Sequence, residues 1–181
     1  MRMKTTDTEL ASAAAGGDRD AFSALLARHY DSLFRVCFRL SGSRPLAEDL
    51  TQDICLALPA KLRGYRAEAK FTTWLYRVAV NAAHDARRRA ATRAKAADGW
   101  GDWEIARRAA DAETAEGLDW LQTAMSALPE DLRDTAALTM GDEMTHAEAA
   151  EALGISEGTV SWRLSEIRKR LKAMRDEELS A

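Results

Sequence analysis

Residues 145–171, THAEAAEALGISEGTVSWRLSEIRKRL, decide the fold of the C-terminal part of the chain. Thr145 and Glu148 have the spacing of a capping box, which predicts that a short helix begins there. Gly154 can adopt the left-handed conformation that ends such a helix, and Ser156 can cap the helix that follows. Two helices joined by so tight a turn are typical of a helix-turn-helix.

The second of these helices has an apolar stripe at helical spacing, formed by Val160, Leu164, Ile167 and Leu171. With that stripe turned inward, the outward side chains are Glu157, Ser161, Ser165 and Arg168, flanked by Thr159, Trp162 and Arg163. Short polar side chains and arginines at the start of such a helix suit contacts with base edges and phosphates in a major groove. The pattern favours DNA binding, and the alternative is a plain helical hairpin packed on its neighbours.

The rest of the chain also has helical periodicity, and its 3 Pro and 10 Gly in 181 residues leave little room for an all-β fold. Apolar positions predict N-terminal helices over about 22–40, 45–58 and 72–96, with Pro59 ending the second, and two further helices over 118–140. We therefore expect an all-α protein with two small helical domains, at 1–96 and 118–181, of which the second is a helix-turn-helix domain, joined by a flexible linker at 97–117.

Charge is distributed unevenly between these parts. Residues 1–97 contain 17 Lys and Arg against 10 Asp and Glu, whereas residues 98–128 and 129–181 each have a net charge of −5. The basic N-terminal part indicates a nucleic-acid partner that the overall net charge of −3 conceals. The acidic C-terminal part predicts weak DNA binding on its own, because phosphate neutralisation supplies much of such affinity.

A basic loop leads into the third predicted helix, and aromatic residues alternate with its cations. Charge for the backbone and rings for the bases are what single-stranded nucleic acid requires. The alternative is a solvated face with core aromatics, which we favour for Trp74 taken alone. The candidate nucleic-acid residues are Lys61, Arg63, Tyr65, Arg66, Lys70, Phe71, Trp74, Arg77, Asn81 and Arg88.

The second predicted helix has an acidic face made of Glu48, Asp49, Gln52 and Asp53. A solvated face and a paired-carboxylate active site are both conceivable, but no phosphate-binding glycine loop, His partner or nucleophile motif accompanies these residues. Beside two candidate nucleic-acid surfaces, a protein-docking surface is the better interpretation.

The remaining patterns argue against other classes of protein. No apolar run is long enough to span a membrane, and the start of the chain lacks a signal-peptide core. Two cysteines are too few for a disulfide framework, so we expect a cytoplasmic protein. We expect no metal and no cofactor, because the three histidines share no ligand spacing with the cysteines; the residues in question are His29, His84, His146, Cys37 and Cys55.

Three segments together resemble bacterial sigma factors of the extracytoplasmic-function (ECF) group. AEDLTQD at 47–53 resembles the segment that docks on the largest polymerase subunit, and FTTWLYRVAVN at 71–81, followed by Asp85 and Arg88-Arg89, resembles the promoter −10 segment. LGISEGTVSWRL at 153–164 resembles the −35 helix-turn-helix. The three occur in the family's order and spacing.

The resemblance implies a function without catalysis, in which the chain binds core RNA polymerase and recognises and melts promoter DNA. It implies that Glu48, Asp49, Gln52 and Asp53 bind polymerase. The loop from Lys61 to Phe71 would capture a flipped base, and Arg77, Asn81 and Arg88 would hold the adjoining backbone. It assigns the −35 element to Ser156, Glu157, Thr159, Ser161, Arg163 and Arg168. An anti-sigma factor is the further partner implied, with no small-molecule substrate and no membrane insertion.

Two other functions fit parts of the sequence. A sigma-like decoy that titrates an anti-sigma factor would normally carry a receiver domain, and no α/β pattern is present. A stand-alone helix-turn-helix regulator would leave the acidic face at 48–53 unexplained. An enzyme has no nucleophile, metal set or cofactor loop to support it.

Overall fold

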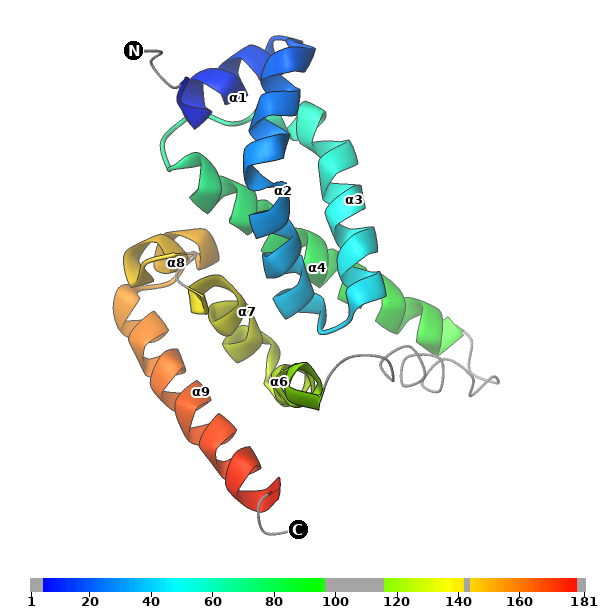
Figure 1. Cartoon of the computed structure of the whole chain (residues 1–181), viewed down its shortest axis with the longest axis vertical. Coiled ribbons are helices and arrows are strands. Elements are labelled where there is room, and N and C mark those ends of the chain that lie inside the picture. The colour runs from blue at the N-terminus through cyan, green and yellow to red at the C-terminus, as the bar shows by residue number, and fades with distance from the viewer. Residues whose placement is uncertain (1–4, 97–115, 142–143, 179–181) are drawn as a thin grey trace.

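The computed structural model describes residues 5–96, 116–141 and 144–178, and every regular element in those ranges is a helix (Figure 1). None of the helices in those ranges has the combination of length and apolar character that crossing a membrane requires. In chain order the helices are α1 (Asp7–Ala15), α2 (Arg19–Ser41), α3 (Arg44–Leu62), α4 (Phe71–Ala96), α6 (Glu116–Ala127), α7 (Glu130–Thr139), α8 (His146–Leu153) and α9 (Glu157–Glu178).

The N-terminal unit consists of α1 to α4, and local signals set its boundaries. The Asp18 carboxylate accepts hydrogen bonds from the first backbone N–H groups of α2, and Gly42 ends that helix with a φ of 68°. Pro45 stands in the first turn of α3, where its missing N–H costs nothing. Fully buried leucines of α2 then pack against α3 and α4, which confirms the three predicted amphipathic helices.

Helix α1 is an addition that the apolar pattern did not predict. A capping box starts it, because Thr6 and Glu9 exchange side-chain and backbone hydrogen bonds. Asp7 then holds α1 to α2 through ion pairs of 2.9 Å with Arg28 and His29. The capping box was the signal in the sequence that could have located this helix.

Helix α3 runs past Pro59 to Leu62, so the prediction that Pro59 ends it was wrong. Proline removes one helical hydrogen bond and its ring crowds the preceding turn. Leu58 and Leu62, on either side of it, are only 2% and 1% exposed, and their burial holds the last turn in place. Lys61 therefore lies on a helix, and the basic loop begins at Arg63.

The C-terminal unit confirms the helix-turn-helix. Gly154 ends α8 with a φ of 67°, and the Ser156 hydroxyl accepts a hydrogen bond of 3.1 Å from the Thr159 amide at the start of α9. Val160 and Ile167, on the apolar stripe of α9, are buried as predicted. Leu132 and Ala136 of α7 complete a small core with Ile167.

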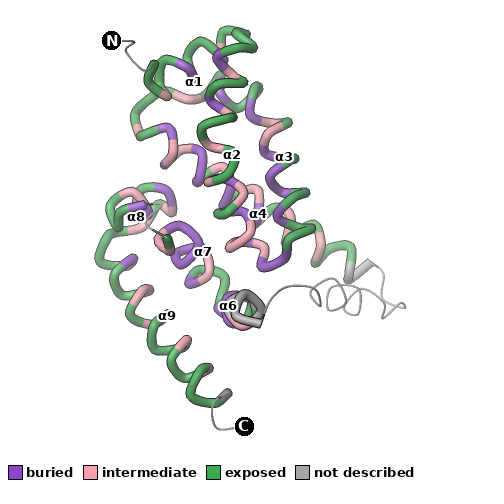
Figure 2. Tube along the Cα trace, viewed as in Figure 1, coloured by how far each residue is buried: buried purple, intermediate pink, exposed green. Residues whose placement is uncertain are grey.

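The two units lie against each other, with α7 beside α2 and α8 beside α4 (Figure 1). One buried hydrophobic cluster is continuous from α1–α4 into α7 and α8, where it includes Leu138, Ala149 and Ala152. Buried residues accordingly occur in both units, on α7 and α8 as well as on α2 and α4 (Figure 2). Of the predicted linker, residues 97–115 lie outside the described residues, and 116–117 already belong to α6.

Candidate protein-docking and nucleic-acid interfaces

The acidic face of α3 is fully presented to solvent. Glu48, Asp49, Gln52 and Asp53 are all exposed. Glu48 forms an ion pair of 3.0 Å with Arg44, one turn earlier on α3. Asp49 and Asp53 form no ion pair with any residue that the structure describes. Four polar side chains on successive turns with so few partners leave their charge available to another molecule.

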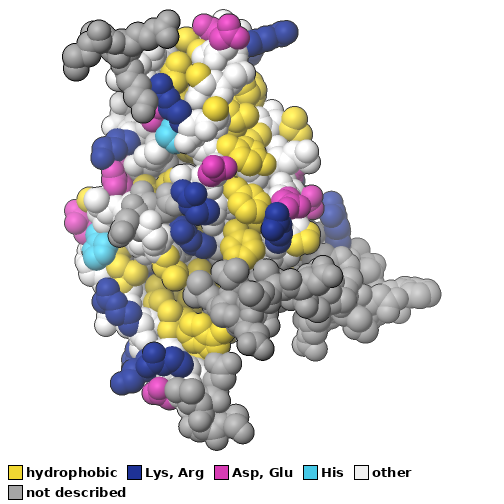
Figure 3. Space-filling view, in the orientation of Figure 1, with side chains coloured by type: hydrophobic (Ala, Val, Ile, Leu, Met, Phe, Trp, Pro, Cys, Tyr) yellow, Lys and Arg dark blue, Asp and Glu magenta, His cyan; other side chains and the backbone are white. Residues whose placement is uncertain are grey.

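An open groove runs between α2 and α3 beside this face. Its wall on α2 includes Leu26, Tyr30 and Phe34, and its wall on α3 includes Glu48 and Asp49. Tyr30 is 46% exposed, unusual for a large aromatic side chain on a helix. The face shown in Figure 3 has hydrophobic side chains gathered in a band with acidic ones close by. An apolar floor with a charged rim is the usual composition of a protein interface.

The aromatic residues around the basic loop pack on one another. Tyr65 lies 5.3 Å from Trp74 and 5.7 Å from Phe71 between ring centroids, and its hydroxyl donates to the Ala69 carbonyl at 3.0 Å. Phe71 also contacts His29 and is only 3% exposed, so no base can stack on it in this conformation. The Phe71 ring instead supports Tyr65 and Trp74, which are half-buried.

The basic residues of the loop and of the first turns of α4 are all exposed, and they differ in whether they contact the C-terminal unit. Lys61, Arg63 and Arg66 are exposed around the start of the loop. Lys70 and Arg77, by contrast, contact the C-terminal unit: Lys70 forms a 2.6 Å ion pair with Glu148, and Arg77 donates to the carbonyl oxygens at the end of α8. The hydrogen bond from Lys70 is the main cause that lowers the pKa of Glu148 to about 2.

Further along α4, Asn81 and Arg88 are exposed, and Arg88 pairs with Asp85 on its own helix. Asn81 lies one turn beyond Arg77. The structure therefore keeps these three predicted residues on neighbouring turns, but only Arg77 contacts the other unit.

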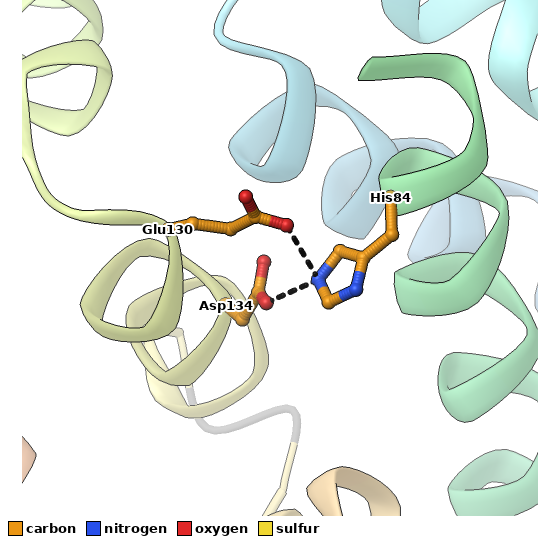
Figure 4. A group of neighbouring side chains, drawn as sticks. All are labelled: His84, Glu130 and Asp134. Carbon is orange, nitrogen blue, oxygen red and sulfur yellow. Dashed lines mark hydrogen bonds and ion pairs between the residues drawn. The ribbon is translucent and has the colours of Figure 1, made fainter. Parts of the chain in front are cut away.

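A cluster at His84 joins α4 to α7 and was missed by the sequence reasoning, which gave His84 no role (Figure 4). The His84 Nε2 lies 2.6 Å from an oxygen of Asp134 and 3.2 Å from one of Glu130. Arg87 donates to the same two carboxylates at 3.3 and 3.0 Å. Asp134 is 4% exposed, so its charge is buried at the junction.

One histidine and two carboxylates form a possible ligand set for a metal ion. Here, however, the Arg87 guanidinium already donates to both carboxylates and offsets part of their negative charge. The cluster is therefore an ion-pair network between the units, as expected for a buried Asp that must be paired. A single sequence could not reveal it, because its members are about fifty residues apart.

On α9, the side chains predicted to face DNA separate into two groups. Ser156, Glu157, Ser161 and Arg168 are exposed, and Thr159 is half-buried.

Arg163 lies against α7 instead, with a side chain 17% exposed that forms an ion pair of 3.4 Å with Asp131. It also donates to the Thr135 hydroxyl at 3.3 Å. Arg163 therefore connects α9 to α7 and does not point outward from α9. Trp162, which flanks the outward side chains in the sequence pattern, is 62% exposed beside Ser161.

The two thiols are unreactive in this setting. Burial raises the pKa of Cys37 to about 11, and burial likewise raises the pKa of Cys55. Both groups are therefore protonated near neutral pH, and a thiolate is what redox and metal chemistry need.

Comparison with known proteins matches both units to parts of one kind of protein. Sigma-70 region 2 matches residues 25–93, and sigma-70 region 4 matches residues 118–171. The ECF RNA polymerase sigma factor SigM of Mycobacterium tuberculosis is 34% identical over 170 residues, covering 94% of this chain and 85% of that protein. The corresponding factor SigW of Bacillus subtilis is 29% identical, covering 88% of this chain and 92% of its own length.

Solved structures agree with these sequence matches. CnrH, in a complex with the cytosolic domain of CnrY, has a TM-score of 0.71 at 27% identity and covers 94% of this chain and 97% of its own. CnrH is an RNA polymerase sigma factor of Cupriavidus metallidurans. The two matched regions and these relatives show that the chain belongs to the ECF group of RNA polymerase sigma factors.

Proposed function

We propose that the chain docks on core RNA polymerase through the acidic face of α3, with Glu48, Asp49, Gln52 and Asp53 as the contacts. The observation that carries this assignment is the exposed row of carboxylates beside the groove lined by Leu26, Tyr30 and Phe34. Complementary charge would speed and orient docking, and the apolar floor would supply buried area.

The loop and α4 form the surface for the −10 element in this proposal. Lys61, Arg63 and Arg66 attract the backbone of the non-template strand, and Tyr65 and Trp74 offer ring faces to an unstacked base. Phe71 acts by supporting those rings. Lys70, Arg77, Asn81 and Arg88 hold the adjoining backbone along α4.

Melting then needs no covalent step and no catalytic residue. Unstacking a base costs a few kcal/mol, and stacking and backbone contacts on this surface offset that cost. A protein that acts in this way on chromosomal promoters works in the cytoplasm, and we assign it there.

We assign the −35 element to the start of α9 and the residue before it, with Ser156, Glu157, Thr159, Ser161 and Arg168 as the DNA contacts. Arg163 contributes indirectly, since its partners on α7 fix the orientation of the recognition helix. The negative charge of residues 129–181 argues that this unit needs polymerase to hold it on DNA. We assign 1–96 to polymerase docking and the −10 element, 97–117 to a linker and 118–181 to the −35 element.

An anti-sigma factor is the second protein partner that we propose. RpoE of Bartonella quintana, whose fold matches with a TM-score of 0.70 at 21% identity, was solved in complex with the anti-sigma factor NepR. The groove between α2 and α3 supports such a partner here, because an inhibitor that covered it would also block polymerase docking.

Run-off transcription tests the function directly. Purified chain would be added to core polymerase on a library of promoter fragments from its own genome. We expect specific transcripts that require the chain and are reduced with Asn81→Ala. Binding to polymerase without transcription from any fragment would favour the decoy, and tight operator binding without polymerase would favour a stand-alone regulator.

A further inference from the structure

Helix α9 exposes a large aromatic side chain on its second turn. Trp162 is 62% exposed, although tryptophan is highly buried on average. The helix packs against α7 and α8 and lies at the edge of the molecule (Figure 1). None of the aromatic contacts among the described residues involves the indole of Trp162. A single exposed apolar side chain is common on protein surfaces, so the position of this one on α9 decides what it can do.

The neighbours of Trp162 on the same face of the helix are small. Gly158 lies one turn before it and Ser165 one turn after it, and both are exposed. The nearest atom that a Cβ at Gly158 would meet is the Ser156 hydroxyl oxygen, at 3.7 Å. Helical side chains lean toward the N-terminus of their helix, so the indole is directed over this open first turn. In a helix-turn-helix, that end of the second helix contacts base edges.

Other side chains at this end of α9 already have partners within the chain. The hydroxyls of Ser156 and Thr159 lie 2.9 Å apart and share a hydrogen bond. Arg163 contacts α7, and Glu166 forms an ion pair of 2.9 Å with Arg170. The indole is therefore the largest group at this end of α9 that the described residues do not engage.

The chemistry of an indole matches one of the four bases better than the others. It has an apolar ring and one N–H group, which donates a hydrogen bond and accepts none. In the major groove, thymine presents a C5-methyl group beside the O4 acceptor, whereas cytosine presents an amino donor. The indole thus complements thymine and meets cytosine donor to donor, a mismatch that adds to specificity.

We propose that Trp162 reads a thymine of the −35 element, with its ring against the C5-methyl group and its N–H toward O4. This inference rests on the proposed assignment of the −35 element to α9. Trp162 is then a determinant of which promoters the chain selects, in addition to the polar residues already assigned to that element.

The same face of α9 continues into cations that suit phosphates. Ser165, Lys169 and Lys172 follow Trp162 at steps of three, four and three residues, and all are exposed. Lys169 lies about 10 Å from Trp162 along the axis, at about 1.5 Å per residue, and the major groove is about 12 Å wide. With the indole in the groove, the two lysines are near the phosphates at its edge. Phosphate contacts would fix the position of the helix, and the indole would add sequence specificity.

Removing single methyl groups from the DNA tests the proposal. The probe is the promoter fragment that the holoenzyme transcribes most strongly in the run-off assay, with each thymine of its −35 region replaced in turn by deoxyuridine. Deoxyuridine lacks only the methyl group. Filter binding would compare holoenzymes made with the wild-type chain, with Trp162→Ser and with the matched control Trp162→Phe, which keeps an apolar ring.

We expect one such replacement to weaken binding by the wild-type holoenzyme about threefold, the size of effect expected for one buried methyl group. The same replacement should not affect the Trp162→Ser holoenzyme, and it should weaken the Trp162→Phe holoenzyme as it does the wild type. Replacing that thymine by 5-methylcytosine keeps the methyl group but presents an amino donor. We expect this change to weaken the wild type more than Trp162→Phe, because only the indole has an N–H group.

Three results would overturn the proposal. Deoxyuridine could leave wild-type binding unchanged at every position, or its effect could persist in Trp162→Ser, which would assign the methyl group to another residue. A loss of binding to core polymerase without DNA in Trp162→Ser would make Trp162 a polymerase contact. If replacing the whole −35 region and the variant Arg168→Ala both leave DNA binding unchanged, the assignment of α9 to the −35 element fails as well.

Discussion

Helices α3 and α4 belong to the same unit, yet their charged faces differ in whether they contact the C-terminal unit. The carboxylates of α3 face solvent, and their one ion pair among the described residues is that of Glu48 with Arg44. Lys70, directly before α4, and Arg77 and Arg87 on α4 contact the C-terminal unit. Both faces are exposed, but several cations of the face that we assign to DNA are paired with the C-terminal unit.

This difference suggests an order of events. An exposed acidic face can attract a protein partner over about a Debye length, and it needs no rearrangement to dock. Cations that are paired with the C-terminal unit must first lose those partners, which reduces their affinity for DNA by the fraction of time that they are paired. Polymerase docking would come first and DNA binding second, with the units separating between them.

Reversing the charge on α3 should have the largest effect. We expect Asp49→Arg/Asp53→Arg to weaken binding to core polymerase about 100-fold, or about 2.8 kcal/mol, because like charges would then face each other. Biolayer interferometry with immobilised core polymerase would measure it. The control, Glu68→Arg/Glu177→Arg, makes the same change in net charge at exposed positions away from α3. If both variants bind as well as the wild type, the docking face lies elsewhere.

Removing the amide of Asn81 should have an intermediate effect that is confined to DNA. We expect Asn81→Ala to slow open-complex formation about tenfold while polymerase affinity stays within twofold, since Asn81 is not part of the acidic face of α3. Fluorescence of a base analogue in the −10 region would report melting. Equal loss of melting and of polymerase binding would remove Asn81 from the DNA interface.

Much of this comparison could be anticipated from the sequence, because it depends on local patterns. Residues only a few positions apart determine the apolar stripes of α2, α4 and α9 and the caps at Thr145 and Ser156. All of these features are present in the structure. The burial of Phe71 and the passage of α3 beyond Pro59 depend on packing partners that a local pattern does not specify.

The contacts between α4 and the C-terminal unit could not be predicted from the sequence for the same reason. Arg77 and its acceptors on α8 are 75 residues apart in the sequence, and His84 is 50 residues from Asp134. Arg163 was read as an outward residue because the helical pattern places it near the polar face, whereas a long guanidinium can bend back to a carboxylate such as Asp131.

On α9 the expected effect is smaller. We expect Arg168→Ala to weaken −35 DNA binding by the holoenzyme about threefold at all sequences, and to reduce the salt slope by about one, because its exposed guanidinium suits a phosphate. Filter binding at several salt concentrations would measure both. A loss confined to one base position would make Arg168 a reader of sequence.

The smallest effect concerns pH. Because the pKa of Glu148 lies near 2 in the folded chain, against an ordinary 4.5, its carboxylate stabilises the fold fully above pH 4.5 and loses that contribution as the pH falls toward 2. We therefore expect the contact with Lys70 to be unchanged between pH 7 and 5. An NMR titration of the Glu148 carboxyl should show a higher pKa in Lys70→Ala than in the wild type. An unchanged pKa would mean that Lys70 does not lower the pKa of Glu148.

Site-specific photocrosslinking at positions 52 and 81 tests the contrast between the two faces most directly. Gln52 and Asn81 are both exposed, so a photoreactive side chain fits at either position. In a mixture of the chain, core polymerase and promoter DNA, we predict that position 52 crosslinks to polymerase whether or not DNA is present. Position 81 should crosslink to the non-template strand when polymerase is present. Crosslinks from position 52 to DNA, or from neither position to its assigned partner, would contradict the assignment of α3 to polymerase and α4 to the promoter.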